Sequence, residues 1–307
     1  MVITPQLSVN IAGVTLANPI ITASGTFGFG REYGALFPLS ELGAITVKGL
    51  TLEERAGNPP PRVAETPSGM LNSVGLQNPG VERFIREELP WLKAQGTVII
   101  ANIAGSTIED YCAIAERLSD TDVDLLELNI SCPNVKQGGA AFGTTCENAA
   151  GVTAGVRRYC TKPLIVKLSP NVADIAEIAA AVVDAGADAL SLINTLLGMR
   201  IDIETRQPIL ANNVGGLSGP AVRPIAVRMV WQVRSRVTVP IIGMGGVAAW
   251  EDAVEMLLAG ANAVAVGTAI YADPYAPVKI KQGLLDYLRC NGIADVNELV
   301  AAVRVNE

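Results

Sequence analysis

The sequence predicts a (β/α)₈ barrel, and two observations carry that prediction. Short apolar segments rich in β-branched residues alternate with segments of helical periodicity along the 307 residues, which is typical of α/β proteins with a parallel sheet. Eight such strands can be counted, and the connections between them and a last helix complete the pattern of a barrel. An open, doubly wound sheet is the alternative architecture.

The predicted elements follow in chain order. The predicted strands are Pro19–Ala23, Ala44–Lys48, Val98–Ile103, Leu125–Ile130, Leu164–Leu168, Ala189–Ile193, Pro240–Gly243 and Ala263–Val266. The predicted helices are Val81–Lys93, Ile108–Leu118, Ala173–Ala185, Ala221–Arg234, Glu251–Ala259 and about Pro277–Arg289. Leu7–Asn10 and Val14–Ala17 flank a short turn and predict an N-terminal β-hairpin before the barrel. No Pro/Ser-rich linker divides the chain, so we expect one domain over residues 1–307.

Composition narrows the possible functions. The formal net charge of −7 argues against a nucleic-acid partner, which requires a basic face. The chain has neither a signal-peptide pattern nor an uncharged apolar run long enough to span a membrane, so we expect a cytoplasmic protein that does not bind membranes. Its five cysteines include no C-x-x-C pair, which suits a reducing compartment and predicts no metal or iron–sulfur site within this chain.

Polar residues stand at the carboxyl ends of the first six predicted strands, where barrels of this class hold their active sites. They are Ser24, Lys48 with Gly49, Asn102, Asn129 with Cys132, Lys167, and Asn194 with Thr195. Six sets on one rim predict a site for a polar ligand. Lys48 and Lys167 would suit an anion or the N1–O2 edge of a flavin, although an ion pair with a neighbouring carboxylate explains either lysine as well.

The last two predicted strands end in residues whose backbone N–H groups can bind a phosphate. They are Gly245, Gly246, Gly267 and Thr268. The segment Gly243-x-Gly245-x-x-Ala248 also fits the relaxed dinucleotide fingerprint. That fingerprint requires an acidic residue at the end of the next strand, and the next strand with its end, Ala263–Thr268, has none. A mononucleotide phosphate is therefore favoured, and glycines that serve only tight turns are the alternative.

The chain contains no histidine, so proton transfer near neutral pH needs another group. Cys132 stands where a predicted strand opens into a loop, between Asn129 and Asn134. A thiol, with an ordinary pKa of about 8.5, is the nearest candidate. A small buried cysteine at a strand end explains the position equally well.

Taken together, these motifs resemble those of the dihydroorotate dehydrogenases. The segments that carry the resemblance are Asn72–Asn78, Asn129–Asn134, Lys167, Asn194–Thr195, Gly215–Pro220 and Gly243–Gly246. The segment Val135–Gly143 resembles the NAD-linked, two-subunit class more than the fumarate-linked, single-subunit class, which remains the alternative. The quinone-linked class is least similar, because it carries an N-terminal extension and a serine base.

The resemblance implies FMN as the cofactor and oxidation of (S)-dihydroorotate to orotate in pyrimidine biosynthesis. The FMN contacts it implies are Ser24, Lys48, Gly49, Asn102, Asn129, Lys167, Ile193, Gly219, Gly245, Gly246, Gly267 and Thr268. The substrate contacts it implies are Lys48, Asn72, Ser73, Val74, Gly75, Leu76, Asn129, Asn134, Asn194 and Thr195. Cys132 would take the C5 proton while C6 gives a hydride to the flavin. The loop from Pro133 to about Thr145 and the connection 196–218 would form a lid over the barrel.

The same resemblance implies a partner. The chain has no iron–sulfur cysteine cluster and no nicotinamide-binding fold, so the NAD-linked class requires a second subunit that carries FAD and a [2Fe–2S] cluster, in a heterotetramer with two copies of each chain. Three other functions stay open. A tRNA dihydrouridine synthase must bind RNA, which conflicts with the negative net charge. An aldolase would use Lys167 as its nucleophile. A non-catalytic phosphate-binding barrel would give Cys132 no role.

Overall fold

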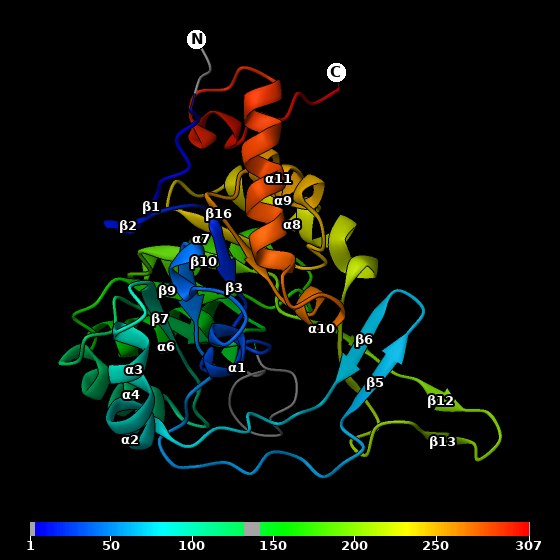
Figure 1. The fold of residues 1–307 in the computed structure, drawn as a ribbon. Coiled ribbons are helices and arrows are strands. Elements are labelled where there is room, and N and C mark those ends of the chain that lie inside the picture. Colours follow the sequence, from blue (N-terminus) through cyan, green and yellow to red (C-terminus); the bar gives the residue numbers. More distant parts are fainter. Residues whose placement is uncertain (1–3, 132–141, 307) are drawn as a thin grey trace.

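The computed structural model describes residues 4–131 and 142–306, and its centre is a closed barrel of parallel strands (Figure 1). The eight barrel strands are β3 (Ile20–Thr22), β4 (Ala44–Thr46), β7 (Val98–Ile103), β8 (Leu125–Asn129), β9 (Leu164–Lys167), β10 (Ala189–Leu192), β15 (Ile241–Met244) and β16 (Ala263–Val266). They pair in chain order, and β16 closes the barrel against β3 with Val264 opposite Ile20. The predicted barrel and all eight predicted strands are confirmed, and the open-sheet alternative is wrong.

The barrel strands are apolar because both of their faces are covered. Every residue of β4, β8, β9, β10, β15 and β16 is buried, as expected for parallel strands between a filled barrel interior and an outer layer of helices. That outer layer consists mainly of α4 (Ile108–Ser119), α6 (Cys146–Arg157), α7 (Ile175–Asp184), α8 (Arg223–Arg234), α9 (Trp250–Ala259) and α11 (Ala276–Cys290). The charged residues in these strands are therefore exceptions that need a reason.

Most predicted helices are confirmed, and their ends follow local chemistry. Thr107 forms a capping box that starts α4 at Ile108, and Asp174 caps α7, which begins at Ile175 rather than at Ala173. The predicted helix Ala221–Arg234 is a 3₁₀ turn, η3 (Pro220–Val222), followed by α8. The predicted helices did not include α6, whose N-terminus is capped by the side chain of Thr145.

The predicted helix Val81–Lys93 is divided into three parts. These are α2 (Val81–Arg83), a π-helical segment η2 (Phe84–Glu88) and α3 (Leu89–Lys93). Pro90 has no N–H group to donate to the carbonyl group one α-turn before it, so the regular α-helical ladder is interrupted there. The prediction of one continuous α-helix is wrong for this reason.

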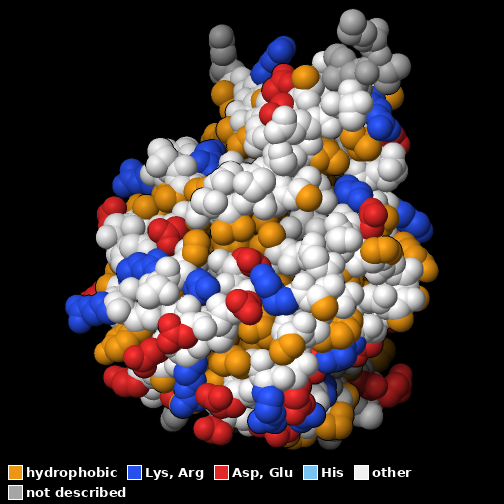
Figure 2. All heavy atoms as spheres, turned by 60° about the vertical axis from the view of Figure 1, so that its left-hand side comes forward, with side chains coloured by type: hydrophobic (Ala, Val, Ile, Leu, Met, Phe, Trp, Pro, Cys, Tyr) orange, Lys and Arg blue, Asp and Glu red, His pale blue; other side chains and the backbone are white. Residues whose placement is uncertain are grey.

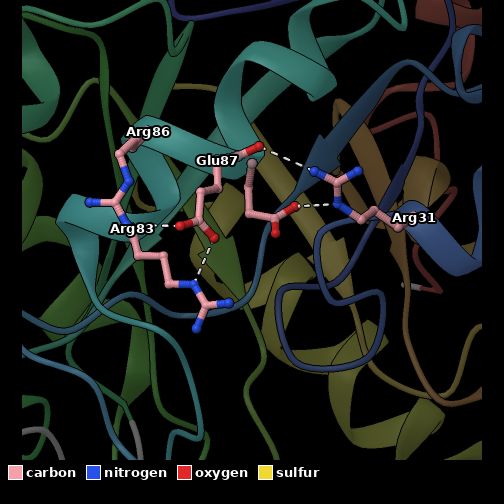
Figure 3. Close-up of polar contacts among 5 residues, drawn as sticks. Arg31, Arg83, Arg86 and Glu87 are labelled. Carbon is pink, nitrogen blue, oxygen red and sulfur yellow. Dashed lines mark hydrogen bonds and ion pairs between the residues drawn. The ribbon is translucent and has the colours of Figure 1, made fainter.

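One ion pair joins this divided helix to the short helix α1 (Arg31–Gly34), and two more lie within the divided helix. Arg31 Nε donates to Glu88 Oε2 at 2.7 Å, while Arg83 and Arg86 donate to the two carboxylate oxygens of Glu87 at 2.7 and 2.8 Å (Figure 3). The guanidinium of Arg31 also donates to the backbone carbonyl of Glu87. Exposed ion pairs of this kind are screened by solvent and contribute little to stability, so they orient the segment more than they stabilise the fold.

A second, antiparallel sheet lies beside the barrel. Its strands, in the order β11–β14–β6–β5, are β11 (Leu196–Gly198), β14 (Gly215–Ser218), β6 (Gly69–Asn72) and β5 (Val63–Thr66). Together with the short ribbon of β12 (Ile201–Asp202) and β13 (Gln207–Pro208), this sheet lies on one side of the molecule (Figure 1). The connection 196–218, expected as a second part of the lid, thus contains the four short strands β11, β12, β13 and β14, and its role as a lid stays a prediction. Glycine explains the close pairing, because a Cβ at Gly216 would lie 2.0 Å from Thr195 Oγ1.

The predicted N-terminal hairpin is confirmed. It consists of β1 (Val9–Ile11) and β2 (Val14–Leu16), and Ala12 and Gly13 between them have positive φ angles, as a tight hairpin turn requires. Figure 2 shows Lys and Arg side chains interspersed with Asp and Glu on one face of the molecule. No helix in residues 4–131 and 142–306 has the length and hydropathy of a membrane span. Most of the expected lid Pro133–Thr145 lies outside the described residues.

Two glycines test how tightly the barrel is packed. A Cβ at Gly43 would lie 1.9 Å from the carbonyl oxygen of Asn18, whereas a Cβ at Gly151, on the exposed side of α6, would meet nothing within 4 Å. We expect Gly43→Ala to destabilise the protein by about 1–3 kcal/mol through overpacking. The matched control Gly151→Ala should stabilise it by about 0.5–1 kcal/mol, because alanine loses less backbone entropy in a helix. Urea unfolding midpoints measure both, and a Gly43→Ala midpoint at or above wild type would contradict the packing.

Candidate functional site

A cavity of about 730 Å³ opens at the carboxyl ends of the barrel strands, within the range of roughly 300–1,000 Å³ typical of small-molecule and cofactor sites. The structure brings most of the predicted site residues to its wall. These are Ser24, Lys48, Gly49, Asn72, Val74, Gly75, Leu76, Asn102, Asn129, Lys167, Ile193, Asn194, Thr195, Gly219, Gly245, Gly246, Gly267 and Thr268. The prediction that these residues share one site is therefore consistent with the fold.

Three predicted residues are not placed on this wall. Cys132 and Asn134 lie outside the described residues. Ser73 is fully buried behind the wall, where its N–H donates to the carbonyl of Arg62 at 2.8 Å and its carbonyl accepts from Asn58 at 2.9 Å. Both backbone groups of Ser73 are used inside the protein, whereas its Oγ atom is buried with no hydrogen-bond partner among the described residues; its contact with a substrate stays a prediction.

Lys167 is the most unusual group in the cavity. Its side chain ends β9, is only 5% exposed, and donates to Ser24 Oγ at 3.3 Å. Among residues 4–131 and 142–306 it forms no ion pair, which removes the ion-pair explanation for this lysine within that part of the chain. A buried ammonium group without an anion is costly. Since Lys48 lines the same cavity, the site suits a ligand with negative charge.

A serine that the sequence reasoning overlooked connects the ends of β8 and β10. Ser131 Oγ donates to Asn129 Oδ1 at 2.9 Å and accepts from Asn194 Nδ2 at 2.7 Å. The backbone carbonyl of Asn129 also accepts from Tyr111 Oη at 2.8 Å. These bonds fix the orientation of both asparagine side chains before any ligand binds. The only sequence signal for Ser131 was its place in the motif Asn129–Asn134.

Asn102 points an unused acceptor into the site. Its Nδ2 donates to Glu127 Oε2 at 2.5 Å, while its Oδ1 is buried and has no hydrogen-bond partner among the described residues. A Cβ at Gly49 would lie only 2.8 Å from this Oδ1 atom, so a glycine keeps the acceptor uncovered. Because buried acceptors are nearly always paired, a ligand with an N–H or O–H donor is the expected partner.

Glycines shape the opposite end of the cavity. Gly219, Gly245 and Gly246 have φ angles of +103°, +124° and +76°, and a Cβ at Gly246 would lie 2.8 Å from the carbonyl oxygen of Gly219. Only glycine allows this backbone conformation without strain. Asp252 holds the following turn by accepting from the N–H groups of Ala248 and Ala249 at 2.8 and 2.9 Å. A backbone-lined end of this kind suits a phosphate better than an apolar group.

One wall of the cavity was not predicted from the sequence. Glu65 and Met70 from β5 and β6, Ser218 from β14, and Tyr271 near the end of the barrel also line it. Their strands were not predicted, because β5 and β6 are short and only partly buried. Among the described residues no group of three acidic, cysteine or histidine side chains could hold a metal ion.

Comparison with known proteins gives a result that agrees with this geometry. The family model for dihydroorotate dehydrogenase matches residues 6–288. The chain belongs to the dihydroorotate dehydrogenase family. The match to the dihydroorotate dehydrogenases covers the barrel and the second sheet, so the family resemblance seen in the motifs is confirmed.

Individual dihydroorotate dehydrogenases are similar over almost the full length. A protein from Alkaliphilus oremlandii (strain OhILAs) is 58% identical over 295 residues, which are 96% of this chain and 98% of the relative. One from Alkaliphilus metalliredigens (strain QYMF) is 59% identical, covering 96% and 97%, and one from Geotalea daltonii is 56% identical, covering 98% and 99%. Each of these relatives is named dihydroorotate dehydrogenase B (NAD(+)), catalytic subunit.

The cysteines outside the cavity allow a chemical test of the fold. Cys160 is buried, its Sγ lies 3.3 Å from the carbonyl of Lys162, and burial raises the pKa of the Cys160 thiol above its ordinary value; Cys290 is exposed. The raised pKa leaves less thiolate at pH 8, so we expect iodoacetamide to label Cys290 in the native protein and Cys160 only after unfolding in urea. Peptide mass spectrometry measures both, and equal native labelling would contradict the structure.

Proposed function

We propose that this chain is the FMN-containing catalytic subunit of an NAD-linked dihydroorotate dehydrogenase, and that it oxidises (S)-dihydroorotate to orotate for pyrimidine biosynthesis in the cytoplasm. The observation that carries this proposal is the shared cavity, in which Lys48, Lys167 and a set of asparagines lie beside a glycine-lined end. The names of the relatives support the reaction and the NAD-linked class.

The residues of the cavity fit FMN. The unpaired acceptor Asn102 Oδ1, uncovered by Gly49, suits a ring N–H group, and the buried Lys167 suits the N1–O2 edge of a flavin, where reduction leaves negative charge. Ser24 and Ile193 line the same region, and the positive-φ glycines with Gly267 and Thr268 would hold the phosphate. FMN, when bound, would supply the acceptor for a hydride.

The same cavity fits a flat carboxylate such as dihydroorotate. Lys48 would pair with the substrate carboxylate, together with the backbone N–H groups of the turn from Val74 to Leu76, which donate to no backbone carbonyl among the described residues. Asn72, Asn129, Asn194 and Thr195 lie on the wall around it. Asparagine supplies both donors and acceptors, as the amide-rich ring of dihydroorotate requires. Asn134 is proposed for the same role from the sequence alone.

The chain's own chemistry is the removal of a proton. We assign this role to Cys132, which follows Ser131 directly in the sequence and lies outside the described residues. The thiolate would accept the proton from C5, the hydride would leave from C6, and the C5–C6 double bond of orotate would form. The asparagines hold the ring in place for both transfers, and a nearby cation or donor would favour the thiolate. Lys167 stabilises negative charge and takes no proton in this scheme.

The electrons must then leave the chain. We infer a partner subunit that carries FAD and a [2Fe–2S] cluster and passes electrons to NAD, in a heterotetramer with two copies of each chain. The relatives are named as catalytic subunits, which supports the existence of a second subunit. The end of β16, where a dinucleotide site would place its acidic ribose-binding residue, carries none in Ala263–Thr268, which supports NAD binding elsewhere.

The assignment of Cys132 is tested by substitution. Cys132→Ala should keep FMN and orotate affinity, because neither requires the sulfur, and should slow anaerobic flavin reduction by dihydroorotate by roughly 10²–10⁴-fold, the usual effect of a positioned general base. Cys132→Ser should also be slow, with a rate that rises toward alkaline pH. Cys290→Ala, which changes an exposed cysteine, is the matched control. Stopped-flow absorbance gives the rates, and wild-type speed in Cys132→Ala would assign the proton to another group.

The need for a partner is tested with the purified chain alone. We expect it to reduce an artificial dye with dihydroorotate but to reduce NAD negligibly, because the chain lacks both a nicotinamide site and an iron–sulfur cluster. Addition of a separately purified FAD and [2Fe–2S] subunit should restore NAD reduction. Steady-state assays with each acceptor measure this, and rapid NAD reduction, or efficient use of fumarate, by the chain alone would overturn the class assignment.

A further inference from the structure

A buried carboxylate lies directly behind the cavity and has no role in the proposed reaction. Glu127 is the only charged residue of β8, Leu-Leu-Glu-Leu-Asn, and it is 2% exposed inside the barrel. It does not line the cavity and forms no ion pair within residues 4–131 and 142–306. A well-packed apolar side chain usually serves packing at lower cost than a buried carboxylate. The position therefore needs another explanation.

The contacts of Glu127 show what it can do. Its Oε2 accepts from Asn102 Nδ2 at 2.5 Å on the neighbouring strand β7, and its Oε1 accepts from Ser191 Oγ at 2.6 Å on β10. In the register of the barrel, Asn102 stands directly opposite Glu127. Both oxygens are therefore held from two sides, and Ser191, itself fully buried, keeps the carboxylate turned toward Asn102.

This arrangement determines which end of the Asn102 amide faces the cavity. An ionised carboxylate only accepts hydrogen bonds, so the Nδ2 group of Asn102 must face Glu127 and the Oδ1 atom must face away from it. That Oδ1 atom is the buried acceptor beside Gly49 that has no partner among the described residues. Without an acceptor at position 127, a ligand that pairs with Oδ1 would leave Nδ2 buried and unsatisfied.

We propose that Glu127, held by Ser191, is a positioning residue for the cofactor: it fixes Asn102 as a hydrogen-bond acceptor for an N–H or O–H donor of the bound flavin. This inference rests on the proposed FMN site. Glu127 acts through Asn102 and touches no ligand itself. The oxidised flavin ring carries one N–H donor, which matches a site that presents a single fixed acceptor.

The test is the dissociation constant of FMN for the apo forms of the full chain, measured by quenching of flavin fluorescence. Glu127→Leu should raise it roughly 5- to 100-fold, the effect expected for a buried donor left unpaired on binding. Glu127→Gln should stay within about threefold of wild type, because the Gln oxygen can still accept from Asn102. In an Asn102→Ala background, Glu127→Leu should cause no further loss beyond about twofold, because residues that act as one unit are not additive.

A matched control separates positioning from general damage to the barrel. Thr22 is buried in β3, accepts from the N–H of Thr46 at 3.1 Å and does not line the cavity. Thr22→Val removes a buried hydrogen bond from the same barrel and should leave FMN binding unchanged. Three results would each overturn the proposal. Glu127→Leu could weaken FMN binding equally with Asn102 present and with Asn102→Ala. Glu127→Leu could bind FMN as tightly as wild type, or Glu127→Gln could fail to retain FMN.

An exchange of the two groups keeps the test open if Glu127→Leu does not fold. In Asn102→Asp combined with Glu127→Gln, the Gln amide donates to the Asp carboxylate, and the second Asp oxygen still faces the cavity as an acceptor. This double variant should bind FMN more tightly than Asn102→Ala, and binding no tighter would overturn the proposal. If the wild-type apoprotein does not bind FMN, the proposed function fails and this inference with it; wild-type binding without the predicted coupling refutes the inference alone.

Discussion

The site depends on one constraint: the buried polar groups at the carboxyl ends of the barrel strands must form hydrogen bonds. A parallel barrel brings the carboxyl ends of all its strands to one rim, and here that rim carries amides, a serine, a carboxylate and a lysine that are almost fully buried. Each such group is costly unless it is paired. Ser131 pairs Asn129 with Asn194, and Glu127 pairs Asn102 with Ser191. The groups left over are the ones that a ligand must satisfy.

Those remaining groups describe the ligand in chemical terms. Lys167 is a buried cation whose hydrogen bond within the described residues goes to Ser24, and Asn102 Oδ1 is an acceptor without a partner among those residues. At the other end, Gly219, Gly245 and Gly246 keep the backbone uncovered, and a Cβ at any of them would collide with a neighbouring atom. A cation, an acceptor and a backbone-lined end in one cavity fit a planar, partly anionic cofactor with a phosphate tail. The family membership and the relatives' names agree with that chemistry.

Much of this could be predicted from the sequence, because barrel strands carry a strong local signal. The run Ala263–Val266 is apolar along its whole length and Val98–Ile103 is apolar except for Asn102, and both strands have the predicted bounds. Lys48, Asn102 and Lys167 were recognisable as site residues because each follows or interrupts such a run. The second sheet was missed because β5 and β11 are short and partly exposed, and because the pairing of β6 with β14 joins segments more than a hundred residues apart, with Asn72 opposite Gly216. Ser131 and Glu127 gave no local signal of their function, since hydrogen bonds across strands appear only in three dimensions.

The central claim is that this chain holds a flavin that takes two electrons from dihydroorotate. Anaerobic titration of the FMN-loaded chain with dihydroorotate, followed by the visible absorbance of the flavin, tests it most directly. The account predicts that the flavin is bleached in proportion to added dihydroorotate, that orotate appears in equal amount, and that Lys48→Ala requires a much higher substrate concentration. A chain that binds no flavin, or a bound flavin whose absorbance dihydroorotate leaves unchanged, would contradict the account.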